Sequence, residues 1–188
     1  MITLLQHAQH HATAWVVVTV AAIVAATIDV RTRRLPNALT GPLLLAGLIW
    51  SAAFGAGVLD GVAGTLTAGL PFFLFWLLRG YGAGDAKMMM ALGAWVGAAG
   101  GTVVLLCVAL AGGVVALAYA LARRQLLSTA GNVLVTMSGA VFLFRGGGRF
   151  RDRQDAIPRY AGKEGIPYGV AIALGTAMAA TIVWVKPW

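Results

Sequence analysis

Only six of the 188 residues are acidic, so the position of each one is informative. Asp29 directly follows a long apolar segment, and Asp85 directly precedes another. An ionisable group at the edge of a membrane-buried segment is costly unless it is paired, protonated or facing a polar cavity, so such residues are usually functional. The remaining four lie in a basic stretch or in a predicted short turn and need no chemical role: Asp60, Asp152, Asp155 and Glu164.

Two aspartates held side by side could hydrolyse a peptide bond. Two close carboxylates resist double ionisation and can share one proton. The ionised carboxylate can then accept a proton from water, while the protonated one polarises a carbonyl group, as in aspartic proteases. The sequence does not specify which aspartate carries the proton. A simple ion pair between Asp29 and the neighbouring Arg31, Arg33 and Arg34, at the level of the lipid headgroups, is the alternative interpretation.

The elements that would position these aspartates are apolar helices. Hydrophobic residues make up 60% of the chain and charged residues 11%, which excludes a disordered or purely electrostatic binding protein. Since about 20 apolar residues make one membrane crossing, we predict an all-α, polytopic integral membrane protein with about six transmembrane helices and a single membrane-embedded domain over residues 1–188. The predicted helices are 14–28, 39–54, 61–78, 88–99, 102–122 and 166–185.

The distribution of charge predicts the orientation of these helices. With six crossings and both termini outside, 13 of the 14 basic residues lie in inner loops, in agreement with the positive-inside rule. A basic cytoplasmic loop is then expected at about 123–165. The moderately apolar stretch 126–144 inside it is predicted to be interfacial or re-entrant, because a full crossing would move six basic residues outside. The same topology places Asp29 and Asp85 at one depth on the inner side.

The residues around Asp85 suggest how it is presented. Gly82 and Gly84 alternate before it and permit an irregular backbone, whereas Lys87 stands where a dinucleotide-binding fingerprint would need glycine. No cofactor is therefore expected. No metal site is expected either, because His7, His10 and His11 lack a nearby carboxylate and the single cysteine, Cys107, lies in an apolar run. Nucleic-acid binding is not expected, since no aromatic pattern accompanies the basic loop.

Three segments resemble a known family, the type IV prepilin peptidases, which are GxGD-type membrane aspartic proteases. The run from Gly82 to Lys87, GAGDAK, resembles the GxGD signature. The run 28–37, IDVRTRRLPN, resembles the family's other aspartate segment, and 166–175, IPYGVAIALG, resembles its C-terminal helix. The three segments occur in the family's order.

The resemblance implies a function. Asp29 and Asp85 would be the catalytic pair that activates water, with Gly82, Gly84 and Lys87 as supporting motif residues. The enzyme would be an intramembrane aspartic endopeptidase of the inner (plasma) membrane. It would remove the leader peptide of type IV prepilins or pseudopilins at the cytoplasmic face, with membrane lipids as its other partners. The compact length resembles peptidase-only members without the cysteine-containing methyltransferase region.

Two functions of other classes remain as alternatives. A small transporter or proton relay would use Asp29 and Asp85 to carry ions or protons, but it would need acidic residues at several depths. A membrane scaffold would use them only to pair with arginines, so that replacing them with asparagine would change stability or assembly more than any reaction. The oligomeric state and the pilus or secretion system served are not specified by the sequence.

Overall fold

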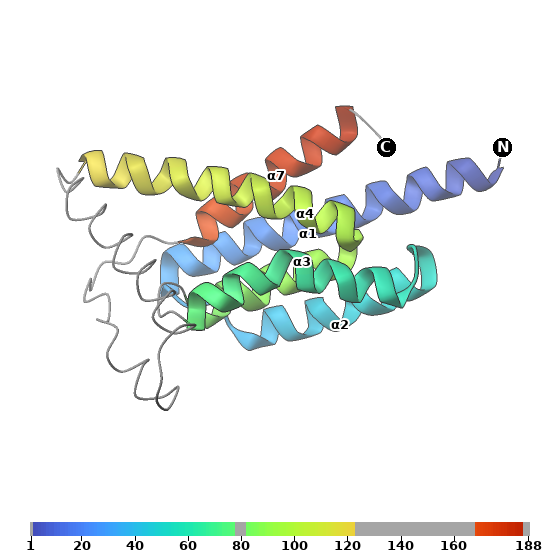
Figure 1. Cartoon of the computed structure of the whole chain (residues 1–188), viewed down its shortest axis with the longest axis horizontal. Helices are drawn as coiled ribbons and strands as arrows, with labels where there is room; N and C mark the ends of the chain where they lie inside the picture. Colours follow the sequence, from blue (N-terminus) through green and yellow to red (C-terminus); the bar gives the residue numbers. More distant parts are fainter. Residues whose placement is uncertain (1, 78–81, 123–167, 186–188) are drawn as a thin grey trace, which may run out of the picture.

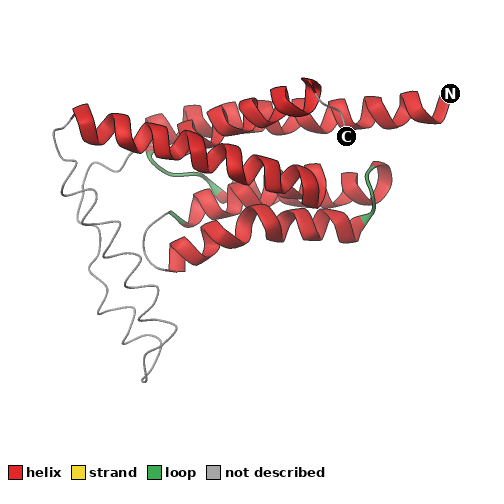
Figure 2. Ribbon diagram, turned by 45° about the horizontal axis from the view of Figure 1, so that its top comes forward, coloured by secondary structure: helices red, strands yellow, loops and turns green. Residues whose placement is uncertain are grey.

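The computed structural model of the chain describes residues 2–77, 82–122 and 168–185, with side chains from residue 12 onward, and this part is entirely helical apart from short loops (Figure 2). The helices run roughly along one long axis (Figure 1). Their bounds are α1, Ile2–Thr32; α2, Asn37–Phe54; α3, Val58–Leu77; α4, Ala83–Ala122; and α7, Tyr168–Val185. All five are long and apolar enough to cross a membrane. The prediction of an all-α polytopic membrane protein is therefore confirmed.

Helix α4 covers two of the six predicted helices, so the residues that the structure describes form five helices rather than six. It is 40 residues long, but Gly97 has non-helical backbone angles, φ 70° and ψ −173°, that separate it into two limbs, 83–96 and 98–122. Figure 1 shows the second limb folding back along the first. These limbs correspond to the predicted helices 88–99 and 102–122. The first limb begins earlier than predicted, at Ala83, and so includes Asp85.

The other helices match their predicted segments, and α1, α2 and α3 begin earlier than predicted. Helix α1 begins at Ile2 rather than at residue 14 and continues to Thr32, so that Asp29 lies inside the helix rather than directly after it. Helix α3 begins at Val58 and therefore includes Asp60, which the sequence analysis placed in a turn. The predictions for 126–144 and for the basic loop 123–165 lie outside the described residues.

Helix α4 is the centre of the bundle and contacts each of the other four helices. Several contacts depend on glycine. A Cβ on Gly93 of α4 would overlap the carbonyl of Gly64 in α3, and a Cβ on Gly175 of α7 would overlap the backbone of Val108. In lipid, where burying apolar side chains gives no driving force between helices, small residues allow this close packing of backbones.

Two pairs of glycines in the chain have small-xxx-small spacing, Gly57/Gly61 and Gly93/Gly97, and only some of these glycines make such contacts. Gly93 and Gly61 lie against neighbouring helices, as the small-xxx-small spacing predicts. Gly57 does not, because it lies in the loop between α2 and α3 with φ 110° and open space around its Cβ position. Gly97 forms the reversal of α4.

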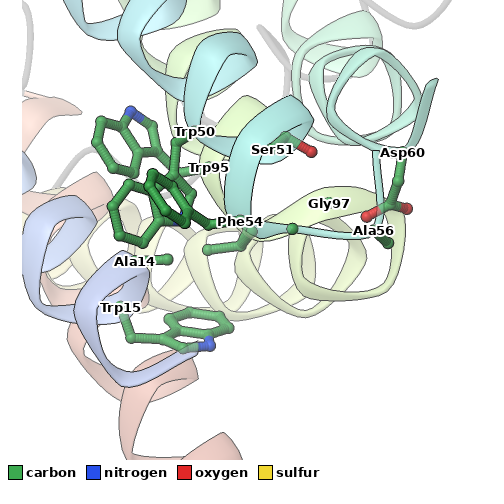
Figure 3. Close-up of a pocket in the computed structure, with 11 residues that line it drawn as sticks. Ala14, Trp15, Trp50, Ser51, Phe54, Ala56, Asp60, Trp95 and Gly97 are labelled. Atoms are coloured by element: carbon green, nitrogen blue, oxygen red, sulfur yellow. The ribbon is translucent and has the colours of Figure 1, made fainter. Parts of the chain in front are cut away.

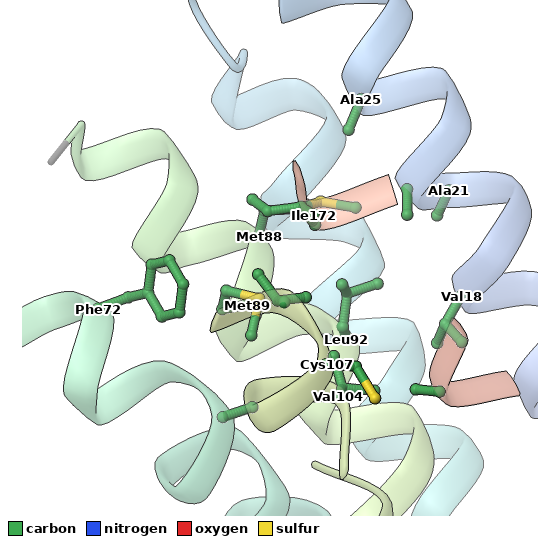
Figure 4. Packing of buried hydrophobic residues seen from close by; sticks show 14 of the residues in the cluster. Val18, Ala21, Ala25, Phe72, Met88, Met89, Leu92, Val104, Cys107 and Ile172 are labelled. Carbon is green, nitrogen blue, oxygen red and sulfur yellow. The ribbon is translucent and has the colours of Figure 1, made fainter. Parts of the chain in front are cut away.

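The buried core lies between α1, α3, both limbs of α4, and α7. Figure 4 shows how closely its side chains pack. Met88, Met89 and Leu92 from the first limb of α4 are fully buried against Ile172 of α7 and Phe72 of α3. Small side chains of α1 pack against this cluster on the side away from Phe72 (Figure 4): Ala21, Ala22 and Ala25. The core therefore fixes the first limb of α4 relative to α1 and α7, which carry the other residues of the candidate site.

Candidate active site

The C-terminus of α1 and the N-termini of α2, α4 and α7 lie at the same end of the bundle, on the left in Figure 1. We call this the aspartate end, because it carries Asp29 and Asp85. The topology derived from the sequence, in which helix one ends where helix four begins, is confirmed. These two residues are 56 positions apart in the chain, and the packing of α1 and α4 against each other and against α7 brings them to one region.

Asp29 is held through both its backbone and its side chain. It is 7% exposed, and its Oδ2 accepts a hydrogen bond of 2.9 Å from the backbone N–H of Gly169 in the first turn of α7. Its carbonyl oxygen accepts a hydrogen bond of 2.7 Å from the N–H of Arg33. Arg33 has φ 52°, which is the left-handed conformation that commonly terminates a helix. Asp29 therefore closes the end of α1 with its backbone and caps α7 with its carboxylate.

Asp85 lies in the first turn of α4 and is half-buried. Its N–H donates to the carbonyl of Gly82 at 3.2 Å, and its carboxylate accepts a hydrogen bond from the Gly82 backbone. A carboxylate at the third helical position commonly accepts such a bond from the residue that caps the helix. Asp85 is thus oriented by the turn in which it lies.

The two glycines of the predicted motif have different roles. A Cβ at Gly82 would lie 3.2 Å from Oδ2 of Asp85, so this position leaves room for the folded-back carboxylate. A Cβ at Gly84 would lie 2.8 Å from Cβ of Leu35, in the segment between α1 and α2. Gly84 therefore lets the start of α4 approach the segment that follows Asp29.

Asp85 is close enough to Asp29 for the two negative charges to repel each other. This is the electrostatic condition under which a pair of carboxylates holds one shared proton. Each carboxylate also lies at the N-terminus of a helix, Asp85 at α4 and Asp29 at α7, and helix N-termini stabilise negative charge. The aspartate end therefore carries two carboxyl groups, the residue type that acid–base hydrolysis of a peptide bond uses.

Lys87, the third supporting residue predicted from the motif, is bonded to α2. It is exposed, and its Nζ donates a hydrogen bond of 2.8 Å to Oδ1 of Asn37, the first residue of α2. This bond links the first turn of α4 to the first turn of α2. Lys87 thus supports the packing of the aspartate end and contributes positive charge there.

A cavity of about 160 Å³ lies at the other end of the bundle (Figure 3). Trp15, Trp50, Trp95 and Asp60 line it beside Gly97. Gly97 is separated from Asp85 by about 18 Å of helix at 1.5 Å per residue. This cavity is therefore distinct from the candidate active site.

Sequence reasoning missed two residues. Asp60 accepts a hydrogen bond of 3.1 Å from the N–H of Ala98 and so caps the second limb of α4. The one feature of the sequence that could have indicated this capping role is the residue type, because aspartate is common at helix starts. Gly169, which binds Asp29, belongs to a segment noted for its family resemblance, but nothing in its residue type indicated this contact. Among the residues with described side chains, no three His, Cys, Asp or Glu residues gather in a group that could hold a metal ion.

Sequence comparisons with known proteins identify one family and several relatives. Residues 16–117, which include both aspartates, match the model of the type IV leader peptidase family. The chain is similar to proteins named prepilin leader peptidase/N-methyltransferase. It is 44% identical over 98 residues to the one from Burkholderia pseudomallei (strain 1026b), and this match covers 48% of this chain and 32% of that relative. It is 36% identical over 110 residues to the one from Escherichia coli (strain K12), and this match covers 54% of this chain and 49% of that relative.

A third relative of the same name, from Dickeya chrysanthemi, is 42% identical over 80 residues, covering 38% of this chain and 28% of the relative. The matches thus span between about a quarter and a half of these relatives. No solved structure matches the chain.

Proposed function

This chain belongs to the type IV leader peptidase family, and we propose that it is an intramembrane aspartic endopeptidase that removes the leader peptide of prepilins or pseudopilins. The observation that carries the proposal is the meeting of Asp29 and Asp85, from α1 and α4, at one end of a bundle of membrane-spanning helices. The family match covers both residues. Residues 1–188 would act as one peptidase domain. The second activity in the relatives' names, N-methylation, does not follow from paired aspartates.

In the proposed mechanism, one carboxylate is ionised and accepts a proton from a water molecule. The resulting hydroxide attacks the carbonyl carbon of the scissile peptide bond, while the protonated carboxyl group donates its hydrogen to the carbonyl oxygen. Collapse of the tetrahedral intermediate then breaks the C–N bond: the leaving nitrogen takes the proton that the first carboxylate accepted from water, and the second carboxylate regains a proton from a hydroxyl of the intermediate. Asp29 and Asp85 are the two groups that exchange these protons. No cofactor is needed for this balance.

The proposed reaction takes place on the cytoplasmic side of the plasma membrane. Arg31, Arg33, Arg34 and Lys87 are exposed at the aspartate end. In addition, α4 ends and α7 begins at this end, and the sequence between these two helices is rich in Lys and Arg. Since Lys and Arg are concentrated on the cytoplasmic side of membrane proteins, the aspartate end would face the cytoplasm, and both chain termini would lie outside.

A proton relay fits the structure less well than a peptidase. Asp60 does lie at the end opposite to the aspartate pair, inside α3. However, the fully buried Met88, Met89 and Leu92 occupy the first limb of α4 between the two ends. Apolar side chains neither donate nor accept protons, so these residues would interrupt a path along that limb.

Coexpression with a prepilin tests the proposal. The probe is a prepilin with a basic leader, a glycine before the cleavage site and an apolar N-terminal helix, and the products are followed by gel shift and N-terminal mass. Asp29→Asn and Asp85→Asn each remove one proton-transferring group, so we expect cleavage to fall by about 10²–10⁴-fold. Asp60→Asn is the matched control, because the amide oxygen of asparagine can still accept the hydrogen bond from the N–H of Ala98. This variant should cleave prepilin at the wild-type rate.

The same experiment can reject the proposal. If either aspartate variant of the pair cleaves at the wild-type rate at equal enzyme levels, that residue is structural. If the wild-type chain leaves every tested prepilin intact, the peptidase assignment is wrong for this chain.

A further inference from the structure

The first turn of α7 reaches the candidate active site. Gly169 is the second residue of α7, and its N–H is one of the groups at a helix start that have no partner within the helix. This N–H donates to Oδ2 of Asp29 at 2.9 Å, and the bond is buried. It joins two residues that are 140 positions apart in the chain.

The contact leaves no space for a side chain at position 169. A Cβ there would lie 2.8 Å from Cβ of Asp29, 3.0 Å from its Oδ2 and 3.2 Å from Cα of Ala26. Two of these three atoms belong to Asp29 itself. Gly169 and Asp29 are therefore matched in shape as well as joined by a hydrogen bond.

A single hydrogen bond of this kind orients the carboxylate. Holding Oδ2 in place restricts rotation about the Cβ–Cγ bond of Asp29, so the direction of Oδ1 is restricted as well. A catalytic carboxylate must lie within hydrogen-bond reach of the group whose proton it moves. A displacement of about 1 Å can reduce the rate about 100-fold.

The start of α7 is itself firmly placed. The ring of Tyr168 packs edge-on against Phe72 of α3, with centroids 5.7 Å apart, and its hydroxyl lies against Gly112 in the second limb of α4. Three residues later, Ala171 and Ile172 are fully buried. The donor N–H is therefore fixed relative to α3 and α4, and through α4 relative to Asp85.

From these contacts we propose that the N-terminus of α7 is part of the active site and that Gly169 is a positioning residue, which sets the orientation of the Asp29 carboxylate for proton transfer. The inference rests on the proposed peptidase function. It assigns a role to the C-terminal helix that the pair of aspartates alone does not require. Glycine is needed at position 169 because any Cβ would displace the carboxylate that the N–H must bind.

Kinetics of Gly169→Ala give the first test. We expect kcat for prepilin cleavage to fall about 100-fold, with KM changed less than threefold, because the atoms nearest to the added Cβ belong to Asp29 and Ala26, so that the Cβ displaces the carboxylate. Gly175→Ala is the matched control, since its Cβ would overlap the Val108 backbone and loosen α7 from α4 away from Asp29. It should reduce the melting temperature at least as much as Gly169→Ala while keeping kcat within about fivefold of wild type.

Equal losses of kcat in the two variants would overturn the proposal. So would a kcat of Gly169→Ala that lies within threefold of the wild-type value.

Hydrogen–deuterium exchange of the segment 168–172 gives a second test that needs no cleavage and no change at Gly169. Asp29→Ala removes the acceptor of the Gly169 N–H and should speed exchange in this segment. Asp85→Ala, which also removes a carboxylate of the pair, should leave it unchanged.

The exchange test separates failure of this inference from failure of the proposed function. If Asp29→Ala leaves exchange in 168–172 unchanged, the contact does not hold Asp29 and the positioning role is wrong, whatever prepilin cleavage shows. If exchange responds as expected but Asp29→Asn still cleaves prepilin, the contact exists and the peptidase mechanism is wrong.

Discussion

Replacement of Gly97 by alanine tests the folding back of α4. The backbone angles of Gly97, φ 70° and ψ −173°, lie in a region that residues with a side chain hardly occupy, at a cost on the order of 1–3 kcal/mol. An added Cβ would also overlap the carboxylate of Asp60. That overlap would disrupt the cap on the N–H of Ala98, which adds about 1 kcal/mol. The expected destabilisation is therefore about 2–4 kcal/mol.

The assay is thermal unfolding of the purified protein in one detergent at one heating rate. For a chain of about this length, 1 kcal/mol corresponds to about 2–4 °C, so Gly97→Ala should melt about 4–16 °C below wild type. Gly113→Ala is the control in the same helix, because nothing lies within 4 Å of its Cβ position. Alanine is the better helix former there, so this variant should melt no lower than wild type.

A double variant separates the two parts of the cost. In an Asp60→Ala background the cap is already lost and the overlap is relieved, so Gly97→Ala should cost about 1 kcal/mol less than it does alone. If Gly97→Ala melts within about 1 °C of Gly113→Ala, position 97 does not need glycine. The reversal of α4 and the capping role of Asp60 would then both be wrong.

Two further predictions concern the supporting residues of the aspartate end. Gly84→Ala should lower stability by about 1–3 kcal/mol and slow prepilin cleavage, because its Cβ would lie 2.8 Å from that of Leu35. Gly41→Ala, with open space around its Cβ, should do neither, and equal behaviour of the two variants in melting and cleavage assays would contradict this packing. Lys87→Met removes an exposed hydrogen bond to Asn37 worth about 0.5–1.5 kcal/mol, and cleavage should stay within about twofold of wild type. A much larger loss of cleavage at normal enzyme levels would mean that Lys87 takes part in the reaction.

The helices themselves could be predicted because each apolar segment is a local feature of the sequence. Their ends could not, since hydropathy does not detect where a backbone turns. Gly97 is one of many glycines in apolar surroundings, and its positive φ results from the packing of both limbs of α4 against α3. Asp60 appeared to be a turn residue for the same reason, although it lies in α3 and caps the second limb of α4.

The candidate site was predictable as far as topology and motif allow. Counting crossings was enough to place Asp29 and Asp85 on one side. The partner of Asp29 was not predictable, because the Gly169 N–H comes from a helix 140 residues further along the chain and offers no side-chain signal. Likewise, Gly84 could be recognised as part of a motif, whereas its close approach to Leu35 depends on how α4 packs.

The reversal at Gly97 also has a consequence for the lipid around the protein. The first limb of α4, 83–96, rises only about 21 Å at 1.5 Å per residue, whereas the hydrocarbon layer of a bilayer is about 30 Å thick. A limb this short cannot extend from one headgroup region to the other, and the surrounding lipid adapts to such a mismatch by thinning. Asp85 lies at the start of that limb, so thinning of the bilayer there would make it easier for water to reach its carboxylate. If the proposed peptidase function holds, shorter acyl chains would bring the aqueous phase closer to the carboxylates and would speed prepilin cleavage.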